Sequence, residues 1–104
     1  MNAKAELVHR SKFVLNSGLV EEIVIWRVLK NEHYPEGIKY SLLLADPLWK
    51  KVLILFDNHA PKGHHRHDSD GREYPYQFVS LQVLVKDFLK LRSIQEKQYE
   101  NNEN

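Results

Sequence analysis

The sequence predicts an α+β domain in which a four-stranded antiparallel meander precedes a histidine-rich loop and one long C-terminal amphipathic helix. In the first half of the chain, four apolar runs are separated by short segments that contain glycine, proline or both, as strands joined by turns are. After residue 80 the apolar period changes to that of a helix. A length of 104 residues accommodates one hydrophobic core. We therefore expect residues 1–100 to form a single domain and residues 101–104 to be a disordered tail.

The first two apolar runs cover residues 6–15 and 19–29. In the first run, apolar side chains fall mainly on one parity, which is typical of a strand with one buried face. Asn16, Ser17 and Gly18 then provide the residue types of a tight turn. The second run is apolar at both odd and even positions, so we expect it to be a central strand of the sheet.

A polar loop over residues 30–37 separates the second run from the third, which covers residues 38–45. The fourth run, residues 49–57, follows a reversal that contains Asp46 and Pro47, two residue types that favour turns. Because these connections are short, the four runs are predicted to form an antiparallel meander.

The last element is predicted to be a helix that begins after Ser80, a residue type that commonly caps helix N-termini. Its apolar residues follow the spacing of one helix face. They are Leu81, Leu84, Val85, Phe88 and Leu91. One helix covers only one face of such a sheet, so we expect the other face to bind a second copy of the chain, as a homodimer, or a protein partner. Coverage by the N-terminal residues or the loops is the alternative.

Composition excludes several classes of protein. Without cysteine, the chain has no disulfides, thiolate nucleophiles or cysteine metal sites. No apolar run approaches the ~20 residues of a membrane-spanning helix, and the first residues lack the apolar stretch of a secretory signal. We therefore expect a cytoplasmic protein with no membrane contact. The formal net charge of +1 provides no global attraction to nucleic acid.

Four of the six histidines, His59, His64, His65 and His67, lie within nine positions. They belong to the segment 57–73, which also contains three basic and four acidic side chains and is almost free of apolar residues. Such a segment does not build a core. It follows the end of the fourth apolar run, where a rigid strand supports it, as scaffolds commonly support functional loops.

The first interpretation of this segment is general acid–base catalysis. Imidazole titrates near neutral pH, so one of His64, His65 and His67 can remove a proton while another delivers one. Asp57 would orient one ring, as the third member of a catalytic triad does. The expected phosphate-binding residues are Lys62, Arg66 and Arg72. This set suffices for a ribonuclease without a cofactor, because the 2′-hydroxyl of RNA serves as the nucleophile.

Two other interpretations stay open. His65 and His67 point to the same side of an extended segment, and with Asp57 or His59 they offer the donor set of a divalent metal such as Zn²⁺, Ni²⁺ or Mn²⁺. The protein is then metal-binding, or a metal-dependent nuclease. In the last interpretation the segment is a solvated loop, and the protein is a non-enzymatic module that binds a partner through its uncovered sheet face.

A longer pattern in the chain resembles a known family. Residues 55–58 (Leu-Phe-Asp-Asn) are followed by a short loop with a proline, by His64-His65-x-His67 and by the amphipathic helix. Other matching features are Glu6, Gly18, Trp26-Arg27 and Tyr40. In these features the chain resembles the TumE-type toxins of prokaryotic type II toxin–antitoxin pairs.

The resemblance implies a small cytoplasmic toxin that is encoded beside a helix-turn-helix antitoxin and restrained by binding it. It also implies that RNA is the substrate. The residues that match the family motif are Asp57, Asn58, His64, His65 and His67. His59 stands beside them at a position where the family pattern favours a small residue or proline.

Overall fold

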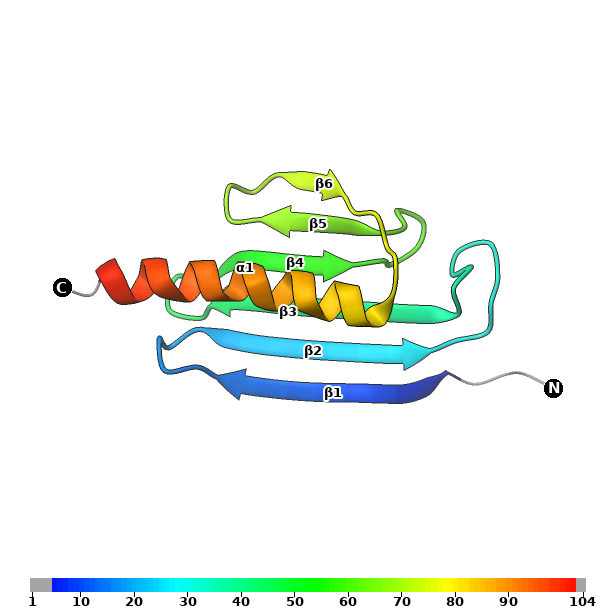
Figure 1. The fold of residues 1–104 in the computed structure, drawn as a ribbon, viewed down its shortest axis with the longest axis horizontal. Coiled ribbons are helices and arrows are strands. Elements are labelled where there is room, and N and C mark those ends of the chain that lie inside the picture. The colour runs from blue at the N-terminus through cyan, green and yellow to red at the C-terminus, as the bar shows by residue number, and fades with distance from the viewer. Residues whose placement is uncertain (1–4, 103–104) are drawn as a thin grey trace.

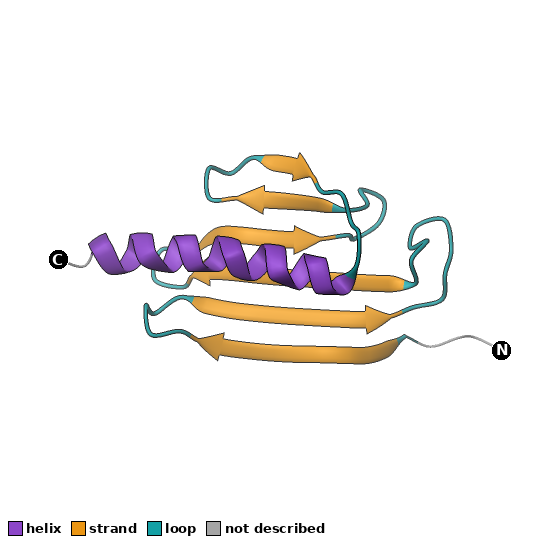
Figure 2. Cartoon of the chain, in the orientation of Figure 1, coloured by secondary structure: helices purple, strands orange, loops and turns teal. Residues whose placement is uncertain are grey.

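The computed structural model describes residues 5–102, which form six strands and one helix (Figure 1; Figure 2). The strands are β1 (Glu6–Val14), β2 (Val20–Arg27), β3 (Ile38–Asp46), β4 (Lys51–Asp57), β5 (His65–Asp68) and β6 (Glu73–Pro75). Each strand pairs antiparallel with the next, so the sheet order is the chain order. Helix α1 (Leu81–Asn102) crosses one face of this sheet (Figure 1).

The α+β class, the antiparallel sheet and the C-terminal helix are confirmed, but the prediction of four strands is wrong, because the sheet has six. The additional strands β5 and β6 come from the histidine-rich segment that the sequence predicts as a loop. A tight turn joins them. The Asp68 N–H donates to the Arg72 carbonyl oxygen over 3.1 Å, and Gly71 adopts a φ of +80°, which glycine tolerates. The hairpin pairs backbone groups of β4 that a sheet edge would leave unpaired.

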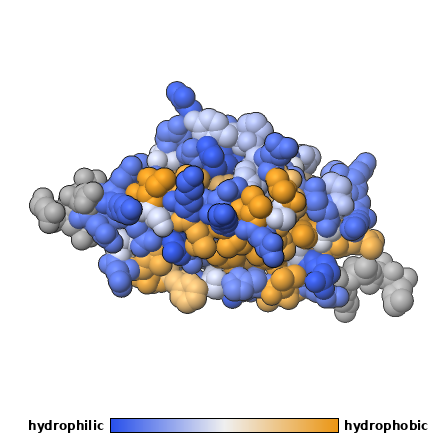
Figure 3. Space-filling view, viewed as in Figure 1, coloured by the Kyte–Doolittle hydropathy of each residue, from blue (hydrophilic) through white to orange (hydrophobic). Residues whose placement is uncertain are grey.

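The hydrophobic core lies between the sheet and α1. Side chains alternate along each strand, and in β2 and β3 the buried residues are those on the helix side. The core includes Ile23, Ile25, Leu42, Leu44, Phe56, Leu84 and Phe88. The opposite side of the sheet, away from α1, is called the open face below. On the helix side, Figure 3 shows further apolar side chains beside the helix, over β1 and β2.

A β-bulge in β1 separates two residues that the sequence assigns to one face. The register against β2 shifts between Leu7 and His9. Leu7 pairs with Trp26 on the open face, whereas Phe13 pairs with Glu21 on the helix side. The apolar parity of the first run therefore does not mark one face along its whole length.

Polar contacts fix α1 at its start and along its length. Ser80 caps the helix as predicted, because its Oγ accepts the N–H of the third helical residue over 3.2 Å. Farther along, Arg92 Nη1 lies 2.6 Å from Glu21 Oε1, and the Tyr99 hydroxyl donates to Asp46 Oδ2 over 2.8 Å. These ties connect the helix to β2 and to the end of β3.

Helix α1 extends to Asn102 and so includes the first two positions of the segment 101–104. Residues 103 and 104 of this predicted tail lie outside the described residues, as do residues 1–4 of the predicted domain. No helix within residues 5–102 combines the length and the apolar character needed to cross a membrane.

Asn58 closes the end of β4 against β3. It is 2% exposed, its Oδ1 accepts the Tyr40 N–H over 2.9 Å, and its Nδ2 donates to the Ile38 carbonyl oxygen over 2.8 Å. The side-chain amide thus supplies one acceptor and one donor to β3, as the backbone of a partner strand does. Asn58 thereby determines where the chain leaves the sheet, directly after Asp57.

We expect Asn58→Ala to lower the free energy of unfolding by about 2–4 kcal/mol, because it leaves a buried N–H and a buried carbonyl without partners. Urea denaturation followed by circular dichroism measures the effect. Asn16→Ala, at an exposed turn position, is the matched control and should change stability by less than about 0.5 kcal/mol. An equal effect of the two substitutions would contradict the assigned role of Asn58.

Candidate active site

Four chemically active side chains occupy facing positions on three neighbouring strands. The register pairs Asp57 of β4 with His65 of β5, and His67 of β5 with Glu73 of β6. Residues directly opposite each other in an antiparallel pair share a face, as do residues two apart in one strand. All four side chains therefore project from one side of the sheet. This is the open face, because the next residue in the ladder, Phe56, packs against the helix.

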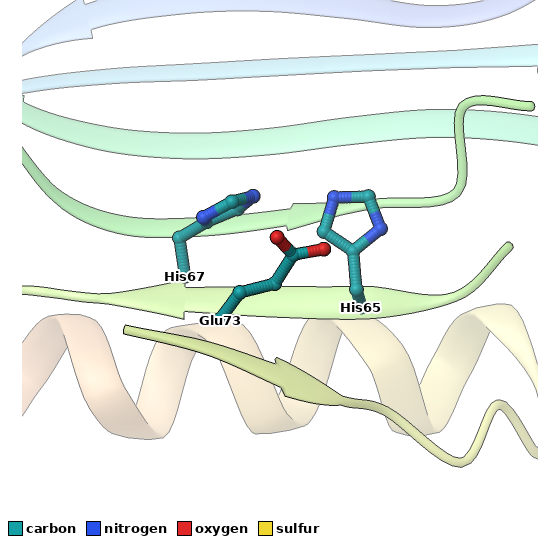
Figure 4. Close-up of side chains that lie close together, drawn as sticks. All are labelled: His65, His67 and Glu73. Carbon is teal, nitrogen blue, oxygen red and sulfur yellow. The ribbon is translucent and has the colours of Figure 1, made fainter. Parts of the chain in front are cut away.

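The two imidazoles and the Glu73 carboxylate converge (Figure 4). The ring centroids of His65 and His67 are 4.9 Å apart, with an angle of 83° between the ring planes. One donor atom from each of His65, His67 and Glu73 lies within 4.8 Å of the other two. The sheet ladder holds these groups near one another without any long flexible loop.

The protonation pattern of His65 follows from its hydrogen bond. Nδ1 lies 2.8 Å from the Gly63 carbonyl oxygen, which can only accept, so Nδ1 carries a proton. The remaining nitrogen, Nε2, is 4.0 Å from Asp57 Oδ1. The same Asp57 oxygen accepts the His59 N–H over 2.6 Å, which fixes the carboxylate. Nε2 of His65 is therefore the atom at which a proton or a metal ion would be exchanged.

Glu73 has a basic neighbour within the same cluster. Lys62 Nζ lies 3.0 Å from Glu73 Oε2, and this hydrogen bond holds the pKa of the carboxyl below its usual range. Both residues also line one surface hollow together with His65. Of the three predicted phosphate-binding residues, Lys62 is therefore the one that the structure places beside the imidazoles.

His64 points to the other side of the sheet and does not join His65 and His67. Its ring stacks on Phe78, with centroids 4.8 Å apart, and on Tyr40. Burial raises the pKa of the Tyr40 hydroxyl, so this group keeps its proton and donates to His64 Nδ1 over 2.8 Å. Nε2 then donates to Glu36 Oε1 over 3.0 Å. Both nitrogens of His64 are thus used in contacts that join β3, the loop before it and the segment before β5.

The remaining predicted residues are also apart from the imidazole pair. Arg66 lies on the helix side, where its Nε is 2.7 Å from Asp68 Oδ1 and its guanidinium lies over the Tyr74 ring. Arg72 belongs to the turn between β5 and β6. Asn58 is buried in the sheet, and His59 is exposed beside Asp57.

Glu73 is the member of the cluster that the sequence did not single out. The detectable signal is the Asp70-Gly71 pair between two short polar segments, since this dipeptide is typical of tight hairpins. A hairpin there places Glu73 opposite His67. With Glu73 included, the cluster has the donor types of a transition-metal site as well as the paired imidazoles of an acid–base site.

The chain matches the family described as "Toxin TumE" over residues 4–98. No curated protein and no solved structure matched the chain.

The contacts of the two neighbouring histidines predict opposite tautomers. In their neutral forms, we expect His65 to carry its proton on Nδ1 and His64 to carry its proton on Nε2. Long-range ¹H–¹⁵N NMR correlations of the imidazole rings distinguish these forms, with the exposed His33 as an internal reference. The same tautomer at both positions would contradict the described geometry.

Proposed function

The chain belongs to the TumE toxin family, and on that premise we propose that it acts on RNA by general acid–base cleavage with His65 and His67. Family membership implies a toxin of a toxin–antitoxin system and hence an antitoxin partner. The observation that carries the proposal is the pair of imidazoles on one sheet face, with ring centroids 4.9 Å apart and a carboxylate opposite each ring.

The proposed reaction needs one neutral and one protonated imidazole. The neutral ring takes the proton of the 2′-hydroxyl, whose oxygen attacks the adjacent phosphorus atom. The bond from phosphorus to the 5′-oxygen breaks, and the protonated ring gives its proton to that oxygen. The products are a 2′,3′-cyclic phosphate and a 5′-hydroxyl. Because the 2′-hydroxyl of the RNA is the nucleophile, the protein does not need to supply one.

The carboxylates indicate which ring takes which role. Glu73 is already paired with Lys62, whereas Asp57 Oδ1 faces His65 Nε2. A carboxylate beside an imidazolium is a favourable ion pair, so we assign the acid to His65 and the base to His67. Lys62 is assigned to the phosphate, because its ammonium lies at the same cluster.

A second candidate is metal-dependent cleavage at the same site. It is favoured by the convergence of donor atoms from His65, His67 and Glu73. In addition, His65 donates Nδ1–H to a backbone carbonyl, which is the usual outer contact of a metal-binding histidine. Lys62 opposes this candidate, because its ammonium already neutralises Glu73.

The antitoxin is proposed to be of the helix-turn-helix type, on the resemblance described above. We assign its contact to the helix side of β1, where the apolar side chain of Phe13 is 57% exposed. A homodimer through the same strand is the alternative arrangement, since β1 is an edge of the sheet and its backbone is available for pairing.

Replacement of either proposed catalytic histidine should remove activity. We expect His65→Ala and His67→Ala to lower kcat/KM for RNA cleavage by about 100- to 10,000-fold and to abolish toxicity on induced expression. The rate of the unmodified protein should be bell-shaped in pH, because one ring must be protonated and the other neutral. Each substitution should remove one side of this profile.

Two other histidines provide matched controls. His33→Ala alters an exposed ring in a loop and should leave cleavage unchanged. His64→Gln removes the ring stacking on Phe78 and Tyr40 and should reduce thermal stability far more than it alters the pH profile. Equal toxicity of the unmodified, His65→Ala and His67→Ala proteins would exclude the proposed mechanism.

Lys62→Gln separates acid–base cleavage from the metal-dependent candidate. In the first mechanism the substitution removes a phosphate contact, and cleavage becomes slower while remaining insensitive to excess chelator. In the metal-dependent mechanism, Lys62→Gln frees Glu73 and should tighten Zn²⁺ binding, which isothermal titration calorimetry measures. Excess chelator should then abolish cleavage. Lys86→Gln, on the exposed side of α1, is the control.

A further inference from the structure

The open face carries basic and aromatic side chains on the same sheet surface as the proposed catalytic groups. Arg10 of β1 pairs with Val24, and Lys39 of β3 pairs with Trp26. The Arg10 guanidinium carbon lies 5.9 Å from the centroid of the Trp26 ring. These residues occupy β1–β3, whereas the imidazoles occupy β5, so one continuous sheet surface connects the two groups.

A small pocket lies between these two groups, over β2, β3 and β4. Its volume is about 150 Å³. The lining residues are Val24, Trp26, Lys39, Tyr40, Ser41, Asp57 and His59. Asp57 belongs to both places, because it lines the pocket and is paired with His65.

We propose that the open face binds single-stranded RNA, with one pyrimidine base in this pocket against Trp26 and backbone phosphates along Arg10 and Lys39. This assignment rests on the proposed function, for which it defines the substrate. A volume of about 150 Å³ is enough for one aromatic ring. Uracil and cytosine share a 2-carbonyl oxygen, and the hydroxyl of Ser41, which lines the pocket, supplies a donor for it.

The charge distribution on the open face supports this occupant. By the strand register, the open face of β1–β3 carries Arg10, Lys12 and Lys39 against the single acid Glu22, an excess of positive charge. Flexible single strands are bound by cations that follow the backbone and by aromatic rings on which bases stack. A base in the pocket brings its ribose and phosphate toward Asp57 and the adjoining imidazole pair, where His67 takes the 2′-hydroxyl proton and His65 protonates the leaving 5′-oxygen.

Binding is measured separately from cleavage by using the full-length His67→Ala protein and a fluorescent 2′-O-methyl oligouridine, which cannot be cleaved. We expect anisotropy titrations to show tighter binding of oligouridine than of oligoadenosine. Trp26→Ala should weaken binding roughly 5- to 150-fold, as the loss of one stacked base does. The affinity of Trp26→Phe should fall between those of the parent protein and Trp26→Ala. Because this variant keeps an aromatic ring, it also serves as the test if the alanine variant is unstable.

The basic residues are tested by the salt dependence of the same titration. Arg10→Gln and Lys39→Gln should each reduce the slope of log affinity against log salt by about 0.7, as expected for one phosphate contact to a single strand. Trp49→Ala and Lys86→Gln are the matched controls, at an exposed turn position and on α1, and should leave affinity and slope unchanged.

The inference is overturned if Trp26→Ala, Trp26→Phe and Lys39→Gln all bind as the parent does, which would leave the open face to a protein partner. It is equally overturned if Lys86→Gln has the same effect as Lys39→Gln. Failure of the proposed function has a different signature. In that case binding depends on Trp26 and Lys39, but the unmodified protein does not cleave RNA.

Discussion

The candidate site depends on the register of β5 against β4. Side chains alternate with a period of two along a strand, so the pairing of Asp57 with His65 decides which residues face outward. In this register His65 and His67 lie on the open face, and Arg66 lies on the helix side. A slip by one residue would exchange the two sets and place the imidazole pair on the helix side of the sheet. The chemistry therefore depends on backbone pairing as much as on the histidines themselves.

Several contacts around β5 oppose such a slip. Asn58 ends β4 at a defined point through its two hydrogen bonds to β3. On the other side of the hairpin, Tyr76 contacts the Phe56 ring edge to face, and its hydroxyl donates to Asp87 of α1 over 2.7 Å. The His64 carbonyl oxygen accepts the Tyr76 N–H over 3.2 Å. Tyr76 thus ties the hairpin to β4 and to the helix, and Asn58 fixes the point at which the chain leaves β4.

The sequence was sufficient to predict the elements that have a periodic pattern of apolar residues. Strands β2 to β4 and α1 each bury a face, whereas β1 is exposed along almost its whole length. Ser80 marks the start of the helix as predicted. Strands β5 and β6 were missed because their open face is polar and their segment contains few apolar residues. There the turn residues Asp70 and Gly71 gave the stronger signal. Local composition also did not reveal that His64 and His65, although adjacent, point to opposite sides of the sheet.

The alternation of side chains along a strand also explains why only two of the four clustered histidines belong to the candidate site. On the helix side, His64 and Arg66 contact Tyr40, Phe78, Asp68 and Tyr74 and so stabilise the hairpin. On the open face, His65 and His67 contact each other and two carboxylates. The basic residues divide in the same way. Arg66 is paired with Asp68 within the hairpin, whereas Arg10 and Lys39 lie on the open face and are distant in sequence from the histidine segment. A net charge of +1 is therefore compatible with a locally cationic surface, because attraction to a phosphate backbone is set by the charges on one face within a Debye length.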